Sequence, residues 1–288
     1  MELAFYKEQL LAKENMLSST LKYLMEIQHS LKEKNEELSE INKGIFESIQ
    51  FAELIQRSLL PNIEVLKIFL KDASYNVIQQ IGIGGDTVFV KNANQGVLFG
   101  LFDSTGHGVP AAMLSISGAL MLNELTSSIN IDSPKLMMKL LNYRLNRTFN
   151  GGLSVAHMEG SMFFFSSKTK KLSYSSAKGK ALYIPISGNV LELPYTKHSI
   201  GEDPSSEYED FDLDFVVGDK MLLYSDGLID QFGGDHDKKF SRSRLKRILS
   251  EHRNKSVNEI KIILEEEHNN WKKNKQQTDD LSYMILEF

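Results

Sequence analysis

The chain has 288 residues, a net charge of −5 and no cysteine, and 41% of its residues are hydrophobic. This balance fits a soluble globular protein with one large domain or two smaller ones, and the lack of cysteine excludes disulfides, a thiolate nucleophile and a cysteine zinc site. The pI near 5.9 argues against a nucleic-acid-binding surface across the chain. No apolar run approaches the roughly 18 residues that span a bilayer, and no signal-peptide pattern is present. We therefore expect a cytoplasmic protein with no membrane span.

Residues 1–60 have the pattern of one long helix. They contain a single glycine, Gly44, and no proline, and they are rich in Glu, Lys, Leu and Ser, which mostly suit helices. The helix should end at Leu59-Leu60-Pro61, because the residue before a proline avoids the helical conformation. An apolar residue recurs at every seventh position: Leu10, Leu17, Leu24, Leu31, Leu38, Ile45, Ala52 and Leu59.

This heptad repeat leaves two interpretations of the helix. A strict seven-residue repeat favours a parallel coiled-coil dimer, in which Asn35, four residues after Leu31, could set the register. The alternative is a long amphipathic helix lying on its own domain, because a second apolar row is incomplete. Eight heptad positions exceed what most globular helices present. We therefore favour a coiled-coil dimerisation and signal-relay segment over 1–60, followed by a domain over 61–288.

Residues 61–288 alternate short strands with two pairs of helices and predict an α+β domain. Many short strands joined by tight turns indicate stacked antiparallel sheets. Helix pairs on the outer faces complete a four-layer α-β-β-α sandwich. We expect strands at 75–80, 87–90, 96–102, 153–157, 161–166, 171–175, 181–186, 189–193, 211–217, 220–224 and 281–288, and helices at 109–125, 135–148, 241–252 and 256–273.

Four acidic sites lie at the ends of apolar strands. A single Asp in a turn commonly caps a helix or makes a local hydrogen bond. If the strands are neighbours, however, the four sites converge at one edge, and clustered carboxylates repel unless cations neutralise them. Oxygen ligands suit Mg²⁺ or Mn²⁺, and two such ions about 4 Å apart can activate water for attack at phosphorus. The sites are Gly84-Gly85-Asp86, Asp103-Ser104-Thr105-Gly106-His107-Gly108, Ser225-Asp226-Gly227 and Gln277-Thr278-Asp279-Asp280.

Other functional signatures are absent or weak. The chain has no Gly-x-x-x-x-Gly-Lys-Ser/Thr loop of the P-loop NTPases and no pair of histidines four residues apart, as in zinc proteases. A basic stretch at 238–247 either docks an acidic partner or, as such runs more often do, forms a solvated helix face. The aspartate sites are therefore the main functional signal.

Together, these aspartate motifs resemble the metal-dependent (type 2C, PPM) protein serine/threonine phosphatases. The motif from Asp103 to Ala112 makes them similar to the bacterial branch named for stage II sporulation protein E and the stress-response phosphatases. Residues 53–61 resemble the first segment of that branch's domain, and Gln231-Phe232-Gly233-Gly234 is similar to a tract in one subgroup. The resemblance runs from about residue 50 to residue 288.

The resemblance implies a role for each acidic site. Asp103 would bridge two Mn²⁺ or Mg²⁺ ions. Asp86 would bind one of them, helped by the backbone carbonyl of Ser104, and Asp226 and Asp279 would hold the other. A water activated by the ions would attack a phosphoserine or phosphothreonine, without a phosphoenzyme.

Two roles stay open within the resemblance. Asp280 would either support the ligands or help to hold a third ion. His107 is either a general acid or a structural residue that shapes its loop. Gly106 and Gly108 would let the backbone pass close to the site, where a Cβ atom would clash.

Three segments depart from the family pattern. Thr87-Val88-Phe89-Val90 follows the first aspartate, where the family usually has aromatic residues and a further Asp. Ala177-Lys178-Gly179-Lys180 replaces a frequent Ala-Gly-His-Asn, and Gly151-Gly152-Leu153-Ser154 replaces an Asp-Gly-Met-Asp-like strand start. None of these changes removes an expected metal ligand, so they bear on substrate contacts and turnover.

We expect a Mn²⁺- or Mg²⁺-dependent serine/threonine phosphatase of bacterial partner switching. The resemblance implies that its substrate is a phosphorylated anti-sigma-factor antagonist of the STAS type. We also expect a homodimer and an upstream activating protein that acts through the N-terminal helix. The alternatives are a catalytically weak or inactive phosphatase-fold binding module that acts as a signalling scaffold, and a coiled-coil adaptor with an inert globular part.

Overall fold

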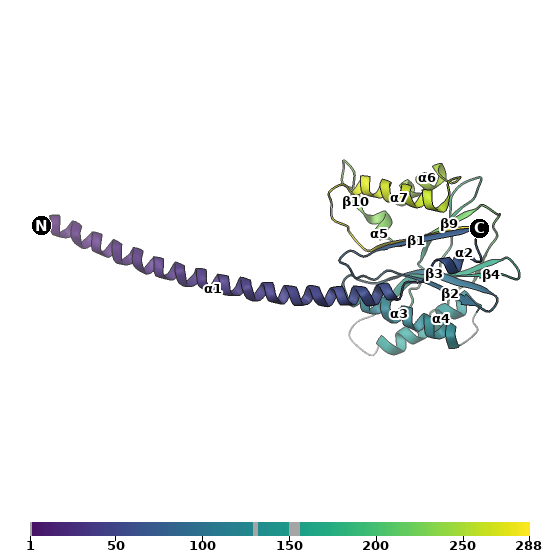
Figure 1. Ribbon diagram of the computed structural model, residues 1–288, viewed down its shortest axis with the longest axis horizontal. Coiled ribbons are helices and arrows are strands. Elements are labelled where there is room, and N and C mark those ends of the chain that lie inside the picture. The colour runs from purple at the N-terminus through teal and green to yellow at the C-terminus, as the bar shows by residue number, and fades with distance from the viewer. Residues whose placement is uncertain (1, 129–131, 150–155) are drawn as a thin grey trace. The chain divides into compact units, whose positions relative to one another are not determined.

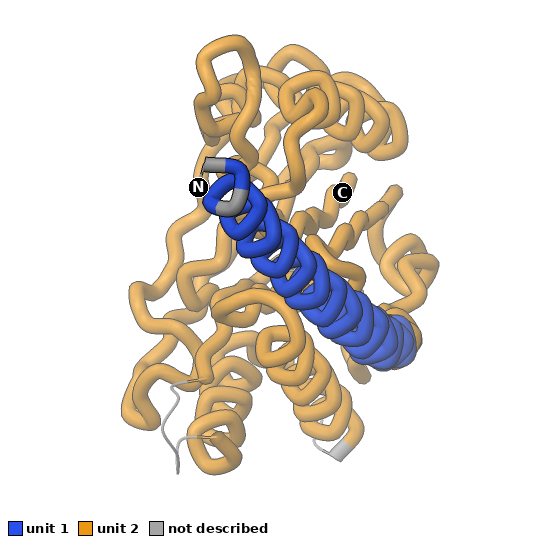
Figure 2. The backbone as a smooth tube through the Cα atoms, turned by 90° about the vertical axis from the view of Figure 1, so that its left-hand side faces the viewer, with its two compact units in different colours: residues 1–51 blue, residues 52–288 orange. Residues whose placement is uncertain are grey.

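The long helix expected at the N-terminus is present as α1 (Glu2–Ser58) in the computed structural model, which describes residues 2–128, 132–149 and 156–288. The helix ends three residues before Pro61, as the sequence predicts. Two compact units are distinguished, residues 1–51 and residues 52–288 (Figure 2). The second unit begins inside α1, whereas the sequence placed this boundary at residues 60 and 61. The reason is that Gln56 is buried and bonded to the globular domain, with its amide nitrogen 2.6 Å from the carbonyl oxygen of Gly84.

Two antiparallel sheets form the centre of the second unit. Within the described residues each sheet has five strands. In the first sheet the order is β1 (Asp72–Ile78), β12 (Leu281–Glu287), β9 (Lys220–Tyr224), β6 (Lys180–Ile184) and β7 (Leu191–Glu192). In the second it is β2 (Thr87–Ala93), β3 (Gly96–Ser104), β4 (Met158–Ser166), β5 (Leu172–Ala177) and β8 (Phe211–Leu213). A small hairpin joins β10 (Phe232–Gly233) to β11 (Lys238–Lys239).

The alternation of side chains along the strands builds the layers. On β9, Met221 and Leu223 belong to the core between the sheets, whereas Leu222 and Tyr224 pack in the core on the outer face. This follows from the two-residue period of a strand, which sends successive side chains to opposite faces. Because both faces of the sheet are apolar, each needs a covering layer.

Helices supply the two outer layers, and the expected four-layer α+β sandwich is confirmed (Figure 1). Leu122 and Leu141, from different helices, pack with β3 and β4 residues in one outer core, and Leu245 and Leu264 pack with β9 and β12 residues in the other. The first pair of helices is α3 (Val109–Ser128) and α4 (Pro134–Phe149), and the second is α6 (Arg242–Glu251) and α7 (Val257–Lys272). Short helices α2 (Glu64–Lys67) and α5 (Gly227–Asp230) complete the unit.

The predicted elements differ from the structure mainly at irregular places. The strands expected at 189–193 and 211–217 are shorter, and α2, α5 and the β10–β11 hairpin were not predicted. These pieces are one turn or two residues long, which gives periodicity too little sequence to act on. Most of the strand expected at 153–157, and the substituted segment 151–154, lie outside the described residues.

One helix qualifies by length and composition to cross a membrane. The segment Val109–Ser127 of α3 has a mean hydropathy of 1.2, although no apolar run of that length was recognised from the sequence. Its buried side chains, including Leu114 and Leu125, pack in the core against the second sheet. A core helix of a soluble protein meets the same criterion, so this is weak evidence for a membrane span.

Candidate metal centre

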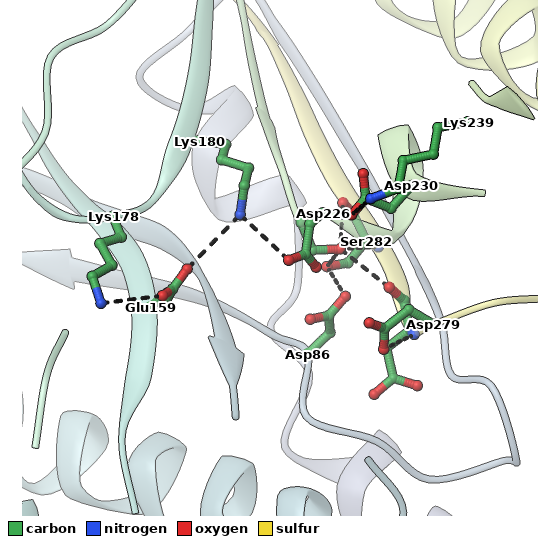
Figure 3. A network of polar contacts seen from close by, with 11 residues as sticks. Asp86, Glu159, Lys178, Lys180, Asp226, Asp230, Lys239, Asp279 and Ser282 are labelled. Carbon is green, nitrogen blue, oxygen red and sulfur yellow. Dashed lines mark hydrogen bonds and ion pairs between the residues drawn. The ribbon is translucent and has the colours of Figure 1, made fainter. Parts of the chain in front are cut away.

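Strand pairing brings the four acidic sites to one end of the two sheets. In the second sheet, Thr87 at the start of β2 pairs with Phe102 near the end of β3. In the first, Tyr224 at the end of β9 pairs with Tyr283 near the start of β12. Asp86 and Asp103 are therefore neighbours on one sheet, and Asp226 and Asp279 are neighbours on the other. Figure 3 shows Asp86, Asp226 and Asp279 grouped around Ser282 of β12.

Asp86 is fixed at the buried side of this centre. Its side chain is 1% exposed, and the hydroxyl of Ser282 donates to its Oδ2 at 2.6 Å. Its Oδ1 is buried without a hydrogen-bond partner in the part of the chain that is described. Burial raises the pKa of Asp86, the bonds from Ser282 and Ser225 oppose this, and the charges of Asp280 and Asp226 add to it.

The glycine before Asp86 is required by a close approach of two chain segments. A Cβ atom on Gly85 would lie 2.5 Å from the carbonyl oxygen of Ser104. The Ser104 amide also donates to the Gly85 carbonyl at 3.1 Å. The loop that carries Asp86 is thus pinned directly against the end of β3, where Asp103 and Ser104 lie, because no side chain separates the two backbones.

At this end of the sheets, the carboxyl group of Asp103 has a strongly raised pKa. Burial raises the pKa of its carboxyl group well above the usual range, and the negative charges of Asp86 and Asp226 raise it further, while Lys180 lowers it. No hydrogen bond to its side chain is found among the described residues, so it is no local turn cap. The shift means that these carboxylates lie close enough to repel one another in a poorly solvated place.

Asp226 stands at the N-terminus of α5, yet its side chain makes no capping hydrogen bond. Its Oδ2 instead lies 3.7 Å from the ammonium nitrogen of Lys180 on β6 (Figure 3). Lys180 in turn lies 3.8 Å from Oε2 of Glu159 on β4. The ordinary explanation of an Asp before a helix, which is capping, therefore does not account for Asp226.

Asp279 and Asp280 have different surroundings. Asp279 accepts a 2.8 Å bond from the next backbone amide, and burial raises its pKa, as do the charges of Asp226 and Asp280. Both oxygens of Asp280 accept backbone N–H groups of the facing loop, from Gln80 at 2.7 Å and from Gly85 at 2.6 Å. These bonds fit the expectation that Asp280 supports the ligands from behind.

The loop after Asp103 places His107 near Asp279 and Asp280, which precede β12 of the first sheet. Its imidazole is exposed, and its charge opposes the effect of burial on the pKa of Asp279 and Asp280. The expectation that a Cβ atom on Gly106 or Gly108 would clash with neighbouring atoms is wrong. A Cβ on Gly106 would meet nothing within 4 Å, and one on Gly108 would make an ordinary 3.5 Å contact. Both glycines are instead needed for backbone angles φ of +90° and +72°.

Several residues of the centre were not identified from the sequence. The only sign of Ser282 in the sequence is a polar residue inside an apolar strand. Lys180 was noted only as a departure from a family motif, and Glu159 carried no signal at all. Gln79 donates to the carbonyl oxygen of Asp86 at 2.9 Å, in the loop before β2.

The residues at this centre supply the kind of donor atoms that bind divalent cations. All the side chains supply oxygen, Oδ1 of Asp86 and Oγ of Ser104 are buried without hydrogen-bond partners in the described structure, and the carboxylates raise one another's pKa. Within residues 2–128, 132–149 and 156–288, no three His, Asp or Glu side chains already surround one ion position. Asp226 is drawn toward Lys180, so its carboxylate would turn toward an ion on binding, whereas Asp86 keeps Oδ1 free while Ser282 holds Oδ2.

Comparison with known families identifies the protein family to which this chain belongs. The sequence model described as stage II sporulation protein E (SpoIIE) matches residues 93–288, more than half of the chain. The chain belongs to the SpoIIE family. A comparison with curated proteins gives no significant match.

Solved structures show the same fold. The SiaA-PP2C domain of Pseudomonas aeruginosa superposes with a TM-score of 0.78 at 21% identity, over 86% of this chain and 98% of that one. The PP2C phosphatase domain with a regulatory fragment of SpoIIE from Bacillus subtilis gives 0.58 at 18% identity, over 75% and 61%. RsbX in complex with magnesium gives 0.54 at 17% identity, over 74% and 92%. The family and enzyme class expected from the motifs are confirmed, and the chain is a metal-dependent PPM-type protein phosphatase.

Proposed function

We propose that this SpoIIE-family chain hydrolyses phosphoserine or phosphothreonine on a regulatory partner protein, with two Mn²⁺ or Mg²⁺ ions and room for a third. The observation that carries the proposal is that Asp86, Asp103, Asp226 and Asp279 lie at one end of the two sheets, where burial and neighbouring carboxylates raise the pKa of Asp86 and Asp103. Such a cluster destabilises the fold at neutral pH unless cations neutralise it. The magnesium complex of RsbX, which shares the fold, supports the choice of ion.

Each acidic residue has a defined part in this proposal. Asp103 would hold both ions, Asp86 and the carbonyl of Ser104 would hold one, and Asp226 and Asp279 would hold the other. When bound, the ions supply a water of lowered pKa and offset the charge of the phosphoryl oxygens. Ser282 orients Asp86, as partners of metal ligands usually do.

The substrate in this proposal is a phosphorylated STAS-type antagonist of an anti-sigma factor. Support comes from the SpoIIE family match and from the shared fold with RsbX and SiaA. His107, on the exposed turn after β3, is positioned either to protonate the leaving group or to shape the turn. Replacing His107 by Gln separates these roles, since the loss of an acid removes one limb of the pH–rate profile.

The decisive experiment compares two Asp→Asn substitutions. Asp103→Asn removes the residue that would contact both ions, whereas Asp230→Asn alters an exposed aspartate on α5 that pairs with Lys239 at 2.8 Å. With Mn²⁺ and a phosphoserine peptide, we expect wild type and Asp230→Asn to release phosphate and Asp103→Asn to be inactive. Turnover by Asp103→Asn at the wild-type rate would contradict the proposal, and a wild type without any metal-dependent turnover would favour the scaffold alternative.

The N-terminal helix is proposed to pair with a second copy of itself. In residues 2–51, the heptad residues are exposed: Leu10 by 70%, Leu17 by 63%, Leu24 by 54%, Leu31 by 62%, Leu38 by 55% and Ile45 by 53%. An apolar row on a helix of this length requires burial in a partner. The proposed role of the pairing is to relay a signal from an upstream protein to the phosphatase domain.

Light scattering of the full chain tests this pairing. Leu24→Asp places a charge in the heptad row, and Ala12→Asp places one two residues beyond Leu10, on the opposite side of the helix. We expect wild type and Ala12→Asp to have the mass of a dimer and Leu24→Asp the mass of a monomer. A wild-type monomer, or a dimer that survives Leu24→Asp, would argue for a helix that does not pair through this row.

A further inference from the structure

The chain passes from one sheet to the other directly beside the carboxylate centre. β5 of the second sheet ends at Ala177, and β6 of the first begins at Lys180, so Lys178 and Gly179 form the crossing. A Cβ atom on Gly179 would lie 2.2 Å from Oγ of Ser161 and 2.4 Å from the carbonyl carbon of Gly160. The crossing is therefore held tightly against β4. Its two lysines start from fixed backbone positions.

The first of these lysines is fully engaged. The ammonium of Lys178 donates to Oγ of Ser199 at 2.7 Å. It also lies 3.6 Å from Glu159 and 3.5 Å from Glu202. These contacts tie Lys178 to the segment after β7 and direct it away from the aspartates.

The second lysine is largely buried but has its donors free. The ammonium of Lys180 lies 3.7 Å from Asp226 and 3.8 Å from Glu159, and both distances exceed that of a hydrogen bond. No hydrogen bond from Lys180 is found in the described residues, and its side chain is only 20% exposed. Figure 3 shows the ammonium extending between the two carboxylates. Three N–H donors are thus available at the edge of the centre.

The position of Lys180 suits a phosphate monoester. Lysine binds phosphate as a compact point charge with three rotatable donors. Lys180 borders a hollow of about 10 Å³, room for one water-sized group, which Asp103, Glu159 and Ser225 also line. A phosphoryl group presented to ions held by Asp103 and Asp226 would come next to these donors. An ammonium that served only as a counter-ion would be expected to bond one carboxylate at short distance, which Lys180 does not do.

We propose that Lys180 binds the phosphoryl group of the substrate, and that before substrate binds its ammonium lies between the carboxylates of Glu159 and Asp226. This inference depends on the proposed phosphatase function, because it assigns Lys180 to the substrate of the same site. It makes Lys180 a substrate-binding residue that favours a phosphorylated side chain over the unphosphorylated product. It also assigns a role to the Ala177-Lys178-Gly179-Lys180 segment, which departs from the family pattern.

Three substitutions test the proposal in the full-length protein. Lys180→Met removes the charge, Lys180→Arg restores it, and Lys178→Met makes the same change two residues away. With saturating Mn²⁺, we expect Lys180→Met to raise both KM for a phosphoserine peptide and the inhibition constant of inorganic phosphate about tenfold. Lys180→Arg should recover most of this loss, and Lys178→Met should stay within about twofold of wild type. Calorimetric titration with Mn²⁺ alone should show that Lys180→Met binds the ion at least as tightly as wild type.

Distinct results would overturn the proposal. Unchanged phosphate affinity in Lys180→Met would do so, as would an equal loss in Lys178→Met or a Mn²⁺ affinity that falls in parallel with phosphate affinity. If the wild type hydrolyses no phosphopeptide, the proposed phosphatase function is wrong, independently of the role of Lys180. Phosphate binding to the Mn²⁺-loaded variants, followed by ³¹P NMR, then still decides whether Lys180 is a phosphate ligand.

Discussion

The two sides of the carboxylate centre are held by different kinds of contact. On the buried side, Asp86 and Asp280 are fixed by short hydrogen bonds from a hydroxyl group and from backbone amides. On the open side, Asp226 has only a long ionic contact with Lys180. Hydrogen bonds to buried carboxylates set direction and distance, whereas a partly exposed ion pair is weak and tolerates movement. The buried side thus acts as a fixed template, and the open side can rearrange when ions and substrate bind.

The largest effect is expected for Asp86→Asn, on the fixed side. Because partners of metal ligands are commonly worth 10–100-fold in affinity or activity, loss of a ligand itself should lower activity by more than about 100-fold. In EDTA, however, the variant should melt at an equal or higher temperature than wild type, because a buried charge that repels its neighbours is gone. Calorimetry with and without Mn²⁺ checks both parts. A variant strongly destabilised in EDTA would show that Asp86 has mainly a structural role.

Asp280→Ala should have the next largest effect. It leaves the buried N–H group of Gly85 without an acceptor, at about 1–3 kcal/mol, removes the bond from the exposed Gln80, and loosens the loop that carries Asp86. We expect a melting temperature lower by several degrees and a Mn²⁺ affinity weakened by about 10–100-fold. Asp280→Asn keeps one acceptor oxygen and should lose less of both. Equal losses in the two variants would mean that charge, and not the backbone bonds, is what Asp280 contributes.

Ser282→Ala tests a single bond of the fixed side. It deletes the 2.6 Å bond to Asp86 and should lower the free energy of unfolding by about 1–3 kcal/mol and activity by about tenfold. Ser175→Ala is the matched control, since Oγ of Ser175 is also buried in a strand but has no hydrogen-bond partner in the described chain. The control should be near wild type in activity. If both variants lose activity equally, strand packing and not the orientation of Asp86 explains the effect.

On both sides the sequence predicted the aspartates but not the residues that contact them. The aspartates were found because each follows or precedes an apolar strand at a turn, which is a local pattern. Their partners Ser282, Glu159 and Lys180 were missed, because each contact joins elements far apart in the chain, and those of Ser282 with Asp86 and of Glu159 with Lys180 also join different sheets. No local pattern records which strands of two sheets face each other. The stacking of the two sheets that brings Asp86 beside Asp226 likewise became known only from the structure.

The smallest effect is expected for Glu159→Gln, on the open side. Its carboxylate is about a quarter exposed, at 27%, and contacts Lys178 and Lys180 only at 3.6 and 3.8 Å. Pairs of this kind are worth about 0–1 kcal/mol, so the melting temperature should change by no more than about 4 °C. Because Lys180 loses one of its two counter-charges, its ammonium should attract phosphate more strongly, and KM for a phosphoserine peptide should fall by about two- to threefold. A KM that rises instead would mean that Glu159 is needed to aim Lys180, and the open side would then be as rigidly built as the buried one.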